Sequence, residues 1–536
     1  MFRFTNLDQK PYWWDEVTNS IHSAGYSKQD FRDRLKVWQN KNITIQDLHE
    51  YQYPTSKTTS LDVVRALANG EPQSPPIYYL LSRWWTQLLG NSVTVQRSLS
   101  ACISLLALPS MYWLCLELFN SSLAAWIGVM LITVSPFHLI FAQEVRIYVL
   151  WTVTILVSSA SLLRAIRLQR KRDWGIYAAS LTFSFYTFPF SILVAVGHGI
   201  HLTITEAREF LANNYRSRNR IKISKTFSNY LAASIASLVA FTPWIFFVIQ
   251  INDKKMVPWR QAILPLADLL KYWLVQTSLI FADLNPEYRG GTGGADSSVS
   301  SFYDPLSFFP TILVWIIIVY ALYSMIRNSP QPIWSFILPL ILVTFLMLMS
   351  ADLISGGMRS TVTRYLIPCY LGIQLSIVNL IHQQINFPKL RRAIIFPSKK
   401  ILELILIIFL STGVISCSLI IRSPSWWNKS IHSQNIPIAN IINSCQNPLI
   451  LTPENSAVHL LSISHNLDSR VTIRFVDKPI INQDSKEFSD LFLLNYPRKW
   501  LNSIQKENKF QLEEIYQGEV VKGRDSIFNF RLLRIL

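Results

Sequence analysis

Long apolar runs with few charged residues follow one another between residues 98 and 421. About 20 apolar residues in a helix cross the roughly 30 Å hydrocarbon core of a bilayer. These runs are apolar on all sides, whereas a helix at the surface of a soluble protein has a polar face. The pattern predicts ten transmembrane helices, at 98–118, 122–142, 145–165, 174–188, 190–206, 228–250, 306–326, 332–350, 364–384 and 401–421.

The basic residues predict how these helices are oriented. They gather in four places: 164–172, 208–225, Arg327 and 389–400. Because Lys and Arg are enriched in cytoplasmic loops, an even number of helices must separate these places if all four are cytoplasmic. Residues 174–206 then form a hairpin of two short helices that turns near Phe188 and Pro189. The stretches expected on the extracytoplasmic side are 1–97, 251–305, 351–363 and 422–536.

The first 97 residues form a polar region with no signal-peptide pattern. Exporting so long a polar segment without a preceding apolar helix is difficult. We therefore expect a further helix upstream of this sequence. We interpret 1–97 as a first extracytoplasmic loop with candidate catalytic acids and interfacial helices.

Residues 422–536 have a different pattern. Short β-like runs at 449–452, 471–476, 491–495 and 527–532 accompany helical patterns at 436–444 and 456–466. Strands and helices of this length predict a small α/β domain. The predicted fold is mainly α: a polytopic transmembrane helical bundle over 98–421 with a small extracytoplasmic α/β domain at 422–536.

The composition favours a membrane protein and excludes several other classes. Half of the 536 residues are hydrophobic and only 15% are charged, whereas about a quarter are charged in soluble domains. The net charge is +17. The basic residues flank the apolar runs and form no nucleic-acid-binding motif. None of the five cysteines has CxxC spacing, so we expect neither a metal site nor a disulfide framework.

Two adjacent acids, Asp15 and Glu16, follow Trp13 and Trp14 in the N-terminal region. One interpretation is structural, because acids stabilise the N-terminal end of a helix. The other is catalytic, because a carboxylate can take a proton from a hydroxyl or amine that attacks a sugar carbon. The aromatic pair suits the headgroup region or a sugar face.

A proline-rich segment begins at Glu71 and includes Ser74 and Tyr78. Consecutive prolines fix the backbone and end any helix before them. The segment is therefore either a turn before an amphipathic stretch or a rigid wall of a binding site. In the second interpretation, all three residues contact substrate.

Charged residues also stand at the predicted outer ends of two spans. Glu144, Arg146 and Tyr148 open the third span, and Arg364 and Tyr365 open the ninth. Charge at the bilayer boundary is costly, so these residues are paired, anchoring or functional. A guanidinium is well shaped to hold a phosphate. Because the acids and arginines map to one membrane face, we predict that they share a substrate-binding site.

Together these segments resemble the GT-C membrane glycosyltransferases, specifically the family 39-like group of protein O-mannosyltransferases and aminoarabinose transferases. The resemblance rests on Asp15-Glu16, Pro75-Pro76-x-Tyr78-Tyr79, the block from Ser135 to Tyr148 and Arg364-Tyr365. It covers about 1–170 and 350–421, and the middle matches only in hydropathy. The sequence departs from the group in two ways, because the first family helix is absent and Ser74 stands where Lys or His is frequent.

The resemblance implies an enzyme that moves a sugar from a polyprenyl-phosphate donor on the extracytoplasmic face, with inversion. It implies that Asp15 is the catalytic base and that Glu16 positions donor or acceptor. Arg146 and Arg364 would neutralise the departing lipid phosphate. The donor is then a lipid-linked sugar, the acceptor is a lipid, glycan or protein, and no cofactor or obligatory metal is required. The expected location is the plasma membrane, which is the inner membrane of a bacterial cell.

The main alternative to a glycosyltransferase is a transporter or flippase of lipid-linked sugars. Transporters commonly have inverted repeats and charges at mid-bilayer, whereas no repeat is visible here and the charges lie at the outer boundary. A non-catalytic scaffold that presents 422–536 would leave the convergence of acids and arginines unexplained. An outer site that holds Asp15 and Arg146 together favours the enzyme, and a path through the bundle favours transport.

Overall fold

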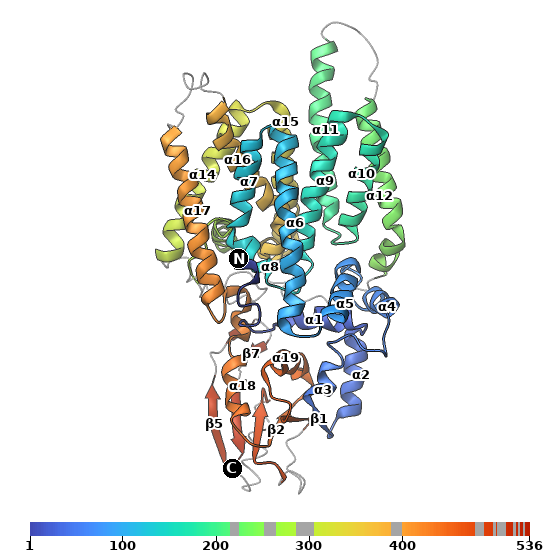
Figure 1. Ribbon diagram of the computed structural model, residues 1–536, viewed down its shortest axis with the longest axis vertical. Helices are drawn as coiled ribbons and strands as arrows, with labels where there is room; N and C mark the ends of the chain where they lie inside the picture. The colour runs from blue at the N-terminus through green and yellow to red at the C-terminus, as the bar shows by residue number, and fades with distance from the viewer. Residues whose placement is uncertain are drawn as a thin grey trace.

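The structure, a computed structural model, shows a helical bundle with a smaller α/β unit at one end (Figure 1). It describes residues 1–214, 224–250, 264–285, 305–386, 399–477, 487–496, 500, 511–517, 521–523, 526–528 and 531–535. The predicted mainly α fold and the small sheet near the C-terminal end of the chain are confirmed. Parts of the basic stretches 208–225 and 389–400 and of the β-like run 527–532 lie outside the described residues.

The bundle consists of long apolar helices in the order that the sequence predicts. They are α6 (Val93–Phe119), α7 (Ser122–Thr133), α8 (Pro136–Ala142), α9 (Tyr148–Leu168), α10 (Lys171–Phe185), α11 (Ser191–Asn214), α12 (Lys225–Ile249), α14 (Pro305–Asn328), α15 (Gln331–Ser355), α16 (Ile367–Asn386) and α17 (Lys399–Arg422). The second predicted span is broken into α7 and α8, which meet at a bend of 62°. The break falls at Ser135-Pro136, because proline at the first position begins a new helix.

Seven of the described helices are long and apolar enough to cross a membrane, and the bent α7–α8 pair would be an eighth. The chain is therefore a multi-pass membrane protein. The prediction of ten spans is too high by this measure, because α10 and α11 are not among the seven. With 15 residues, α10 is about 22 Å long, which is shorter than the hydrocarbon core. The predicted hairpin is nevertheless present, with its turn between Phe185 and Ser191.

The two ends of the bundle differ in what they carry. The α9–α10 and α14–α15 connections lie at one end, and the N-terminal helices and the sheet lie at the other (Figure 1). The first end carries basic residues such as Arg167 and Arg327. This arrangement agrees with the predicted grouping of the loops, and the assignment of one end to the cytoplasm stays a prediction.

The N-terminal region packs against the bundle and enters it. It forms η1 (Phe2–Phe4), α1 (Trp14–Ala24), α2 (Lys28–Trp38), β1 (Asn42–Thr44), α3 (Ile45–His49), α4 (Ser60–Gly70) and α5 (Ile77–Leu89). The buried guanidinium of Arg3 donates to the carbonyl of Ser104 at 2.8 Å and to that of Ile132 at 3.1 Å. Gln143 donates to the carbonyls of Phe2 and Thr5 at 3.0 and 2.9 Å. The chain just before α1 is thereby fixed to α6, α7 and the loop after α8.

The main sheet combines both ends of the sequence. It has the order β1-β3-β2-β4-β8-β5, with β2 (Pro448–Thr452), β3 (Thr472–Phe475), β4 (Asp490–Leu494), β5 (Leu512–Gln517) and β8 (Arg531–Ile535). A separate pair consists of β6 (Val521–Gly523) and β7 (Ser526–Phe528). Strand β1 pairs antiparallel with β3, with Ile43 opposite Ile473. The predicted α/β domain at 422–536 is therefore completed by a strand from the first 97 residues.

A short segment joins the bundle to the sheet. It comprises η7 (Trp427–His432), followed by α18 (Asn435–Asn443) and, beyond β2, α19 (Ala457–Ile463). The indole nitrogens of Trp426 and Trp427 both donate to Asp283 Oδ2 at 2.8 Å. Asp283 lies just after α13 (Leu266–Ser278), so this buried carboxylate fixes the start of η7 against the bundle.

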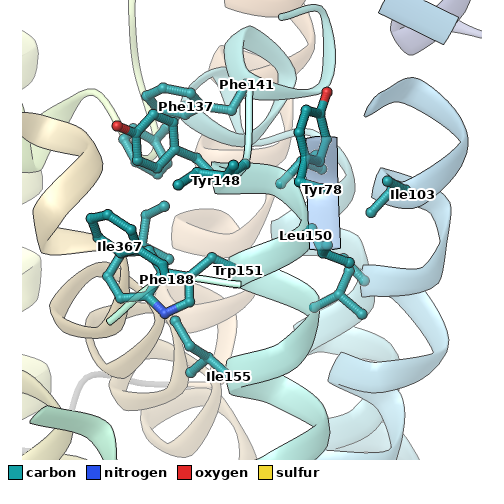
Figure 2. Packing of buried hydrophobic residues seen from close by; sticks show 14 of the residues in the cluster. Tyr78, Ile103, Phe137, Phe141, Tyr148, Leu150, Trp151, Ile155, Phe188 and Ile367 are labelled. Carbon is teal, nitrogen blue, oxygen red and sulfur yellow. The ribbon is translucent and has the colours of Figure 1, made fainter. Parts of the chain in front are cut away.

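An aromatic core packs between α9, the α10–α11 turn and the start of α16. Figure 2 shows Tyr148, Trp151 and Phe188 close to Ile367. The ring centroids of Trp151 and Phe188 are 4.8 Å apart, and those of Tyr148 and Phe188 are 5.9 Å apart. Tyr148 is thus held by packing, which makes it a rigid support for the charged groups next to it.

Candidate active site

Three charged residues from distant parts of the chain meet at one point. Asp15 lies in the first turn of α1, Arg146 in the loop between α8 and α9, and Arg364 in η5 (Thr363–Leu366) before α16. An Nη atom of each arginine lies 3.3 Å from Asp15 Oδ2. Arg146 also donates to the backbone carbonyl of Asp15 at 3.2 Å. The structure therefore brings together the acid and both arginines that the sequence singles out.

The cluster remains partly open. The Asp15 side chain is 27% exposed, Arg146 13% and Arg364 18%. Asp15 Oδ1 has no hydrogen bond or ion pair within the described part of the chain. One carboxylate oxygen is thus held by the arginines, and the other is available to a bound molecule.

Tyr148 is the aromatic surface that supports both guanidinium groups. The guanidinium carbons of Arg146 and Arg364 lie 5.3 and 5.6 Å from the centre of its ring. Arg146 Nη2 also donates to the Tyr148 hydroxyl at 3.2 Å. Arg364 further lies 5.8 Å from the ring of Tyr365. Cation–π attraction and the shared carboxylate offset the repulsion between two adjacent positive charges.

The charge of Asp15 is set by these neighbours. Burial would raise the pKa of the Asp15 carboxyl, but the positive charges of Arg146 and Arg364 outweigh this effect and lower the pKa below its usual range. Asp15 is therefore an ionised carboxylate at neutral pH. It can accept a hydrogen bond or, if the two positive charges are neutralised, a proton.

Glu16 lies at the centre of a buried network of ion pairs and hydrogen bonds. It is fully buried, and Arg97 binds it in a bidentate pair at 2.8 and 2.7 Å. Lys429 Nζ lies 2.9 Å from Glu16 Oε2, and the backbone nitrogen of Val145 donates to Oε1 at 3.1 Å. The catalytic role of Glu16 therefore stays a prediction, and its side chain has no exposed surface in this structure. It fixes Asp15 in place by joining α1 to α6, η7 and the loop that carries Arg146.

Burial raises the pKa of the Glu16 carboxyl less than its partners lower it. The charges and hydrogen bonds of Arg97 and Lys429 bring the pKa down to about 2. Glu16 also accepts from the backbone nitrogen of Trp13 at 3.3 Å, as part of a capping box at the start of α1. The structural interpretation of the acid pair, as the start of a helix, therefore applies to Glu16.

Sequence reasoning missed Arg97, Lys429 and Asn428. Arg97 also donates to the carbonyls of Leu7 and Lys10 at 2.6 and 2.9 Å, which organises the chain before α1. Arg97 is the fifth residue of α6, and Lys429 lies seven residues beyond the end of α17. Neither position has a local motif. A charged residue beside a long apolar run was the single available signal.

Glu144 is buried next to this network. Asn428 donates to its Oε1, and Oε2 has no hydrogen-bond partner among the described residues. Burial raises the pKa of the Glu144 carboxyl above its usual range, although the charge of Lys429 opposes the shift. The backbone carbonyl of Glu144 accepts from the backbone nitrogen of Arg146 at 2.9 Å. Its predicted contact with substrate stays a prediction, and the side chain is nearly inaccessible from outside.

The residues singled out in the 71–79 segment differ in how close they come to the site. Glu71 pairs with Lys28 and lies 3.4 Å from His22 Nε2, and its charge acts on Asp15. The backbone nitrogen of Ser74 donates to the carbonyl of Glu71 at 2.8 Å, so Ser74 forms part of the turn. Tyr78 is fully buried, and its hydroxyl lies 2.6 Å from Ser100 Oγ. Because Tyr78 has no exposed surface, the structure does not bring it to the open part of the site, and its contact with substrate stays a prediction.

The loop that carries Arg364 is held by Asp352 at the end of α15. Asp352 Oδ2 accepts from the backbone nitrogen and the hydroxyl of Ser360, at 2.6 and 2.7 Å. Asp352 Oδ1 accepts from the backbone nitrogen of Arg359 at 2.9 Å. Four residues later the chain reaches Arg364, so its position depends on this buried carboxylate. Within the described ranges, no group of three or more His, Cys, Asp or Glu side chains could hold a metal ion.

Comparisons with known proteins give several similar solved structures, of which two are described here. No protein family model matches the chain, and no curated protein matches it in sequence. The chain is similar to ArnT from Cupriavidus metallidurans bound to undecaprenyl phosphate, with 12% identity and a TM-score of 0.48 over 100% of this chain and 95% of that one. It is also similar to the same protein in the apo state, with 11% identity and a TM-score of 0.44 over 86% of this chain and 87% of that one. The contacts of Asp15, Arg146 and Arg364 determine which chemistry the site can perform.

Proposed function

We propose that the chain is an integral membrane glycosyltransferase that moves a sugar from a polyprenyl-phosphate donor to an acceptor on the extracytoplasmic face. One observation carries the proposal: Arg146 and Arg364 converge on one oxygen of Asp15 and leave the other oxygen open. The arginines lie just before α9 and α16, and we place the boundary of the bilayer at these ends of the two helices. A phosphate on an isoprenoid chain would stand at the same depth.

The reaction is a single displacement at the anomeric carbon of the sugar. Asp15 Oδ1 takes the proton from a hydroxyl or amine of the acceptor, whose lone pair forms a bond to the anomeric carbon. The bond from that carbon to the phosphate oxygen breaks, and its electron pair stays on the phosphate. Arg146 and Arg364 stabilise this developing charge. Attack opposite to the leaving group inverts the configuration.

The proposal includes the surroundings of the site. The donor is a lipid-linked sugar whose isoprenoid lies in the bilayer, and the acceptor is a lipid, a glycan or a protein. The reaction requires neither a cofactor nor a nucleic acid. The expected location is the plasma membrane. The site would face the extracytoplasmic side, because the basic ends of the helices belong on the cytoplasmic side and the helices that carry the site lie at the opposite end.

The substitution Asp15→Asn tests the role of the base. We expect transfer of labelled sugar from a polyprenyl-phosphate donor in proteoliposomes to fall about 10²- to 10⁴-fold, because general base catalysis contributes that much. Asp8→Asn is the matched control, since Asp8 is exposed and should leave transfer unchanged. Undiminished transfer by Asp15→Asn would reject Asp15 as the base. Movement of the donor between leaflets without transfer would favour a flippase.

The substitutions Arg146→Gln and Arg364→Gln test the phosphate contact. We expect each to raise the KM for the donor and to lower kcat, because a charge-assisted contact to the phosphate strengthens as the bond breaks. Arg65→Gln is the control, because its side chain is 65% exposed on α4. Donor saturation curves equal to those of the unaltered protein would contradict the assignment of these arginines.

A further inference from the structure

The arginines that would bind the donor phosphate are already occupied by Asp15. Both Nη contacts end on the same oxygen, Asp15 Oδ2, at 3.3 Å. The Nε atoms of Arg146 and Arg364 are buried and have no hydrogen-bond partner among the described residues. Each guanidinium thus has one group engaged by a carboxylate and one donor with no acceptor. A phosphate has enough oxygens to satisfy the donors that Asp15 leaves unpaired.

We propose that Asp15 and the donor phosphate compete for Arg146 and Arg364, so that donor binding releases Asp15 to act on the acceptor. This inference rests on the proposed function and concerns its order: the donor binds first and the acceptor second. Before the donor binds, the carboxylate is held as the counter-ion of two cations. Once phosphate neutralises these cations, the carboxylate is free to accept a proton.

Among the charged groups near Asp15, the two arginines have the largest coulombic effects on its pKa. The remaining charged and titratable groups with an electrostatic effect on Asp15, or affected by it, are Lys28, Glu71, Glu144, Tyr365 and His432. Lys28 is itself paired with Glu71, so its positive charge is compensated. Arg146 and Arg364 are the two positive charges with the largest effects on Asp15, so phosphate bound to them would remove the main attraction that holds the carboxylate ionised.

A binding measurement shows whether the Asp15 carboxylate opposes or assists the binding of polyprenyl phosphate. The probe is polyprenyl phosphate, titrated into the full-length protein in nanodiscs of neutral phospholipid. We expect Asp15→Asn to bind the probe at least about fivefold more tightly than the unaltered protein, since coupling between sites is typically worth 5- to 150-fold. Asp8→Asn should bind as the unaltered protein does. The double variant Asp15→Asn with Arg146→Gln should lose the gain.

Each outcome of the titration has a distinct meaning. Equal or weaker binding by Asp15→Asn, together with lost transfer, would overturn the competition and leave the proposed function intact. No binding of the probe by either protein would overturn both. Thermal unfolding of each variant shows whether it is folded.

A second measurement uses the unaltered protein alone. The pH profile of kcat/KM for the donor reports on the free enzyme, and that of kcat/KM for the acceptor at saturating donor reports on the enzyme–donor complex. The arginines lower the pKa of Asp15, so neutralising them must raise it. We therefore expect the acidic midpoint of the second profile to lie about one pH unit or more above that of the first. Equal midpoints would overturn the competition.

Discussion

Asp15 and Glu16 are adjacent and chemically similar, yet their surroundings give them different tasks. Asp15 is partly exposed and shares two arginines at 3.3 Å, whereas Glu16 is fully buried and bound by Arg97 and Lys429 at under 3 Å. Successive helix residues are rotated by about 100°, so neighbours in α1 face different groups. The first turn of one helix thus supplies both the proposed catalytic base and the residue that anchors it.

The substitution Glu16→Gln should destabilise the protein strongly. It leaves Arg97 and Lys429 buried without a negative partner, and breaking a buried ion pair typically costs about 3 to 5 kcal/mol. We expect a clear drop in the thermal unfolding midpoint in detergent. Asp33→Asn is the control, because its pair with Lys36 is exposed on α2 and its loss should change the midpoint little. An unchanged midpoint for Glu16→Gln would contradict the anchoring role.

The lowered pKa of Glu16 also makes the stability of the fold depend on pH. The partners of Glu16 lower its pKa from 4.5 in the unfolded chain to about 2 in the fold. A depressed pKa contributes stability that is fully present above pH 4.5 and is lost as the pH falls towards 2. Between these values the unfolding midpoint of the unaltered protein should fall more steeply than that of Glu16→Gln. Parallel curves would show that the Glu16 network does not titrate in this way.

At the scale of elements, the sequence predicted the helices well and their interruptions poorly. Apolar runs and basic ends located every long helix, but the bend at Ser135-Pro136 was hidden within a continuous apolar run. The pairs Arg97–Glu16 and Lys429–Glu16 span 81 and 413 residues, so no local pattern could reveal them. The burial of Tyr78 against Ser100 was not foreseen, because the pattern could not show which face of α5 turns towards α6.

The loop between α15 and α16 is an element whose rigidity should affect donor binding. Asp352→Asn replaces an oxygen that accepts hydrogen bonds from Ser360 or Arg359 with a group that cannot accept them. We expect the KM for the donor to rise roughly tenfold, since displacing a positioning group by about 1 Å can cost up to 10²-fold. Asp268→Asn in α13, which pairs with Lys271 within one helix, is the control. Equal KM values would show that Arg364 is positioned without Asp352.

At the scale of the whole molecule, the site lies where three regions of the chain meet. The N-terminal region supplies Asp15, the bundle supplies both arginines, and η7 supplies Lys429. Bundle and sheet are joined by the Trp426 and Trp427 contacts with Asp283. A conformational change in the α/β unit should therefore alter the contacts of Glu16 through Lys429.

The predicted topology can be tested by labelling single cysteines. Asp8→Cys and Asp468→Cys lie at the end that carries the site, and Arg170→Cys lies between α9 and α10 at the other end. In a background with Cys445→Ser, we expect a membrane-impermeant maleimide to label the first two from outside the cell. Arg170→Cys should be labelled after lysis and not before. The reverse pattern would place the site on the cytoplasmic side and contradict the proposed function.

The pairing of β1 with β3 has a consequence for biosynthesis. Asn42 and Arg474 are joined by a hydrogen bond across 432 residues, and synthesis at about 5 to 20 residues per second separates them by roughly 20 to 90 seconds. During that interval β1 lacks its partner strand β3, and for most of it Glu16 lacks its ion pair with Lys429. The proposed active site therefore assembles late in translation: a chain that ends before β3 would lack the partner strand of β1, and one that ends before η7 would also lack Lys429.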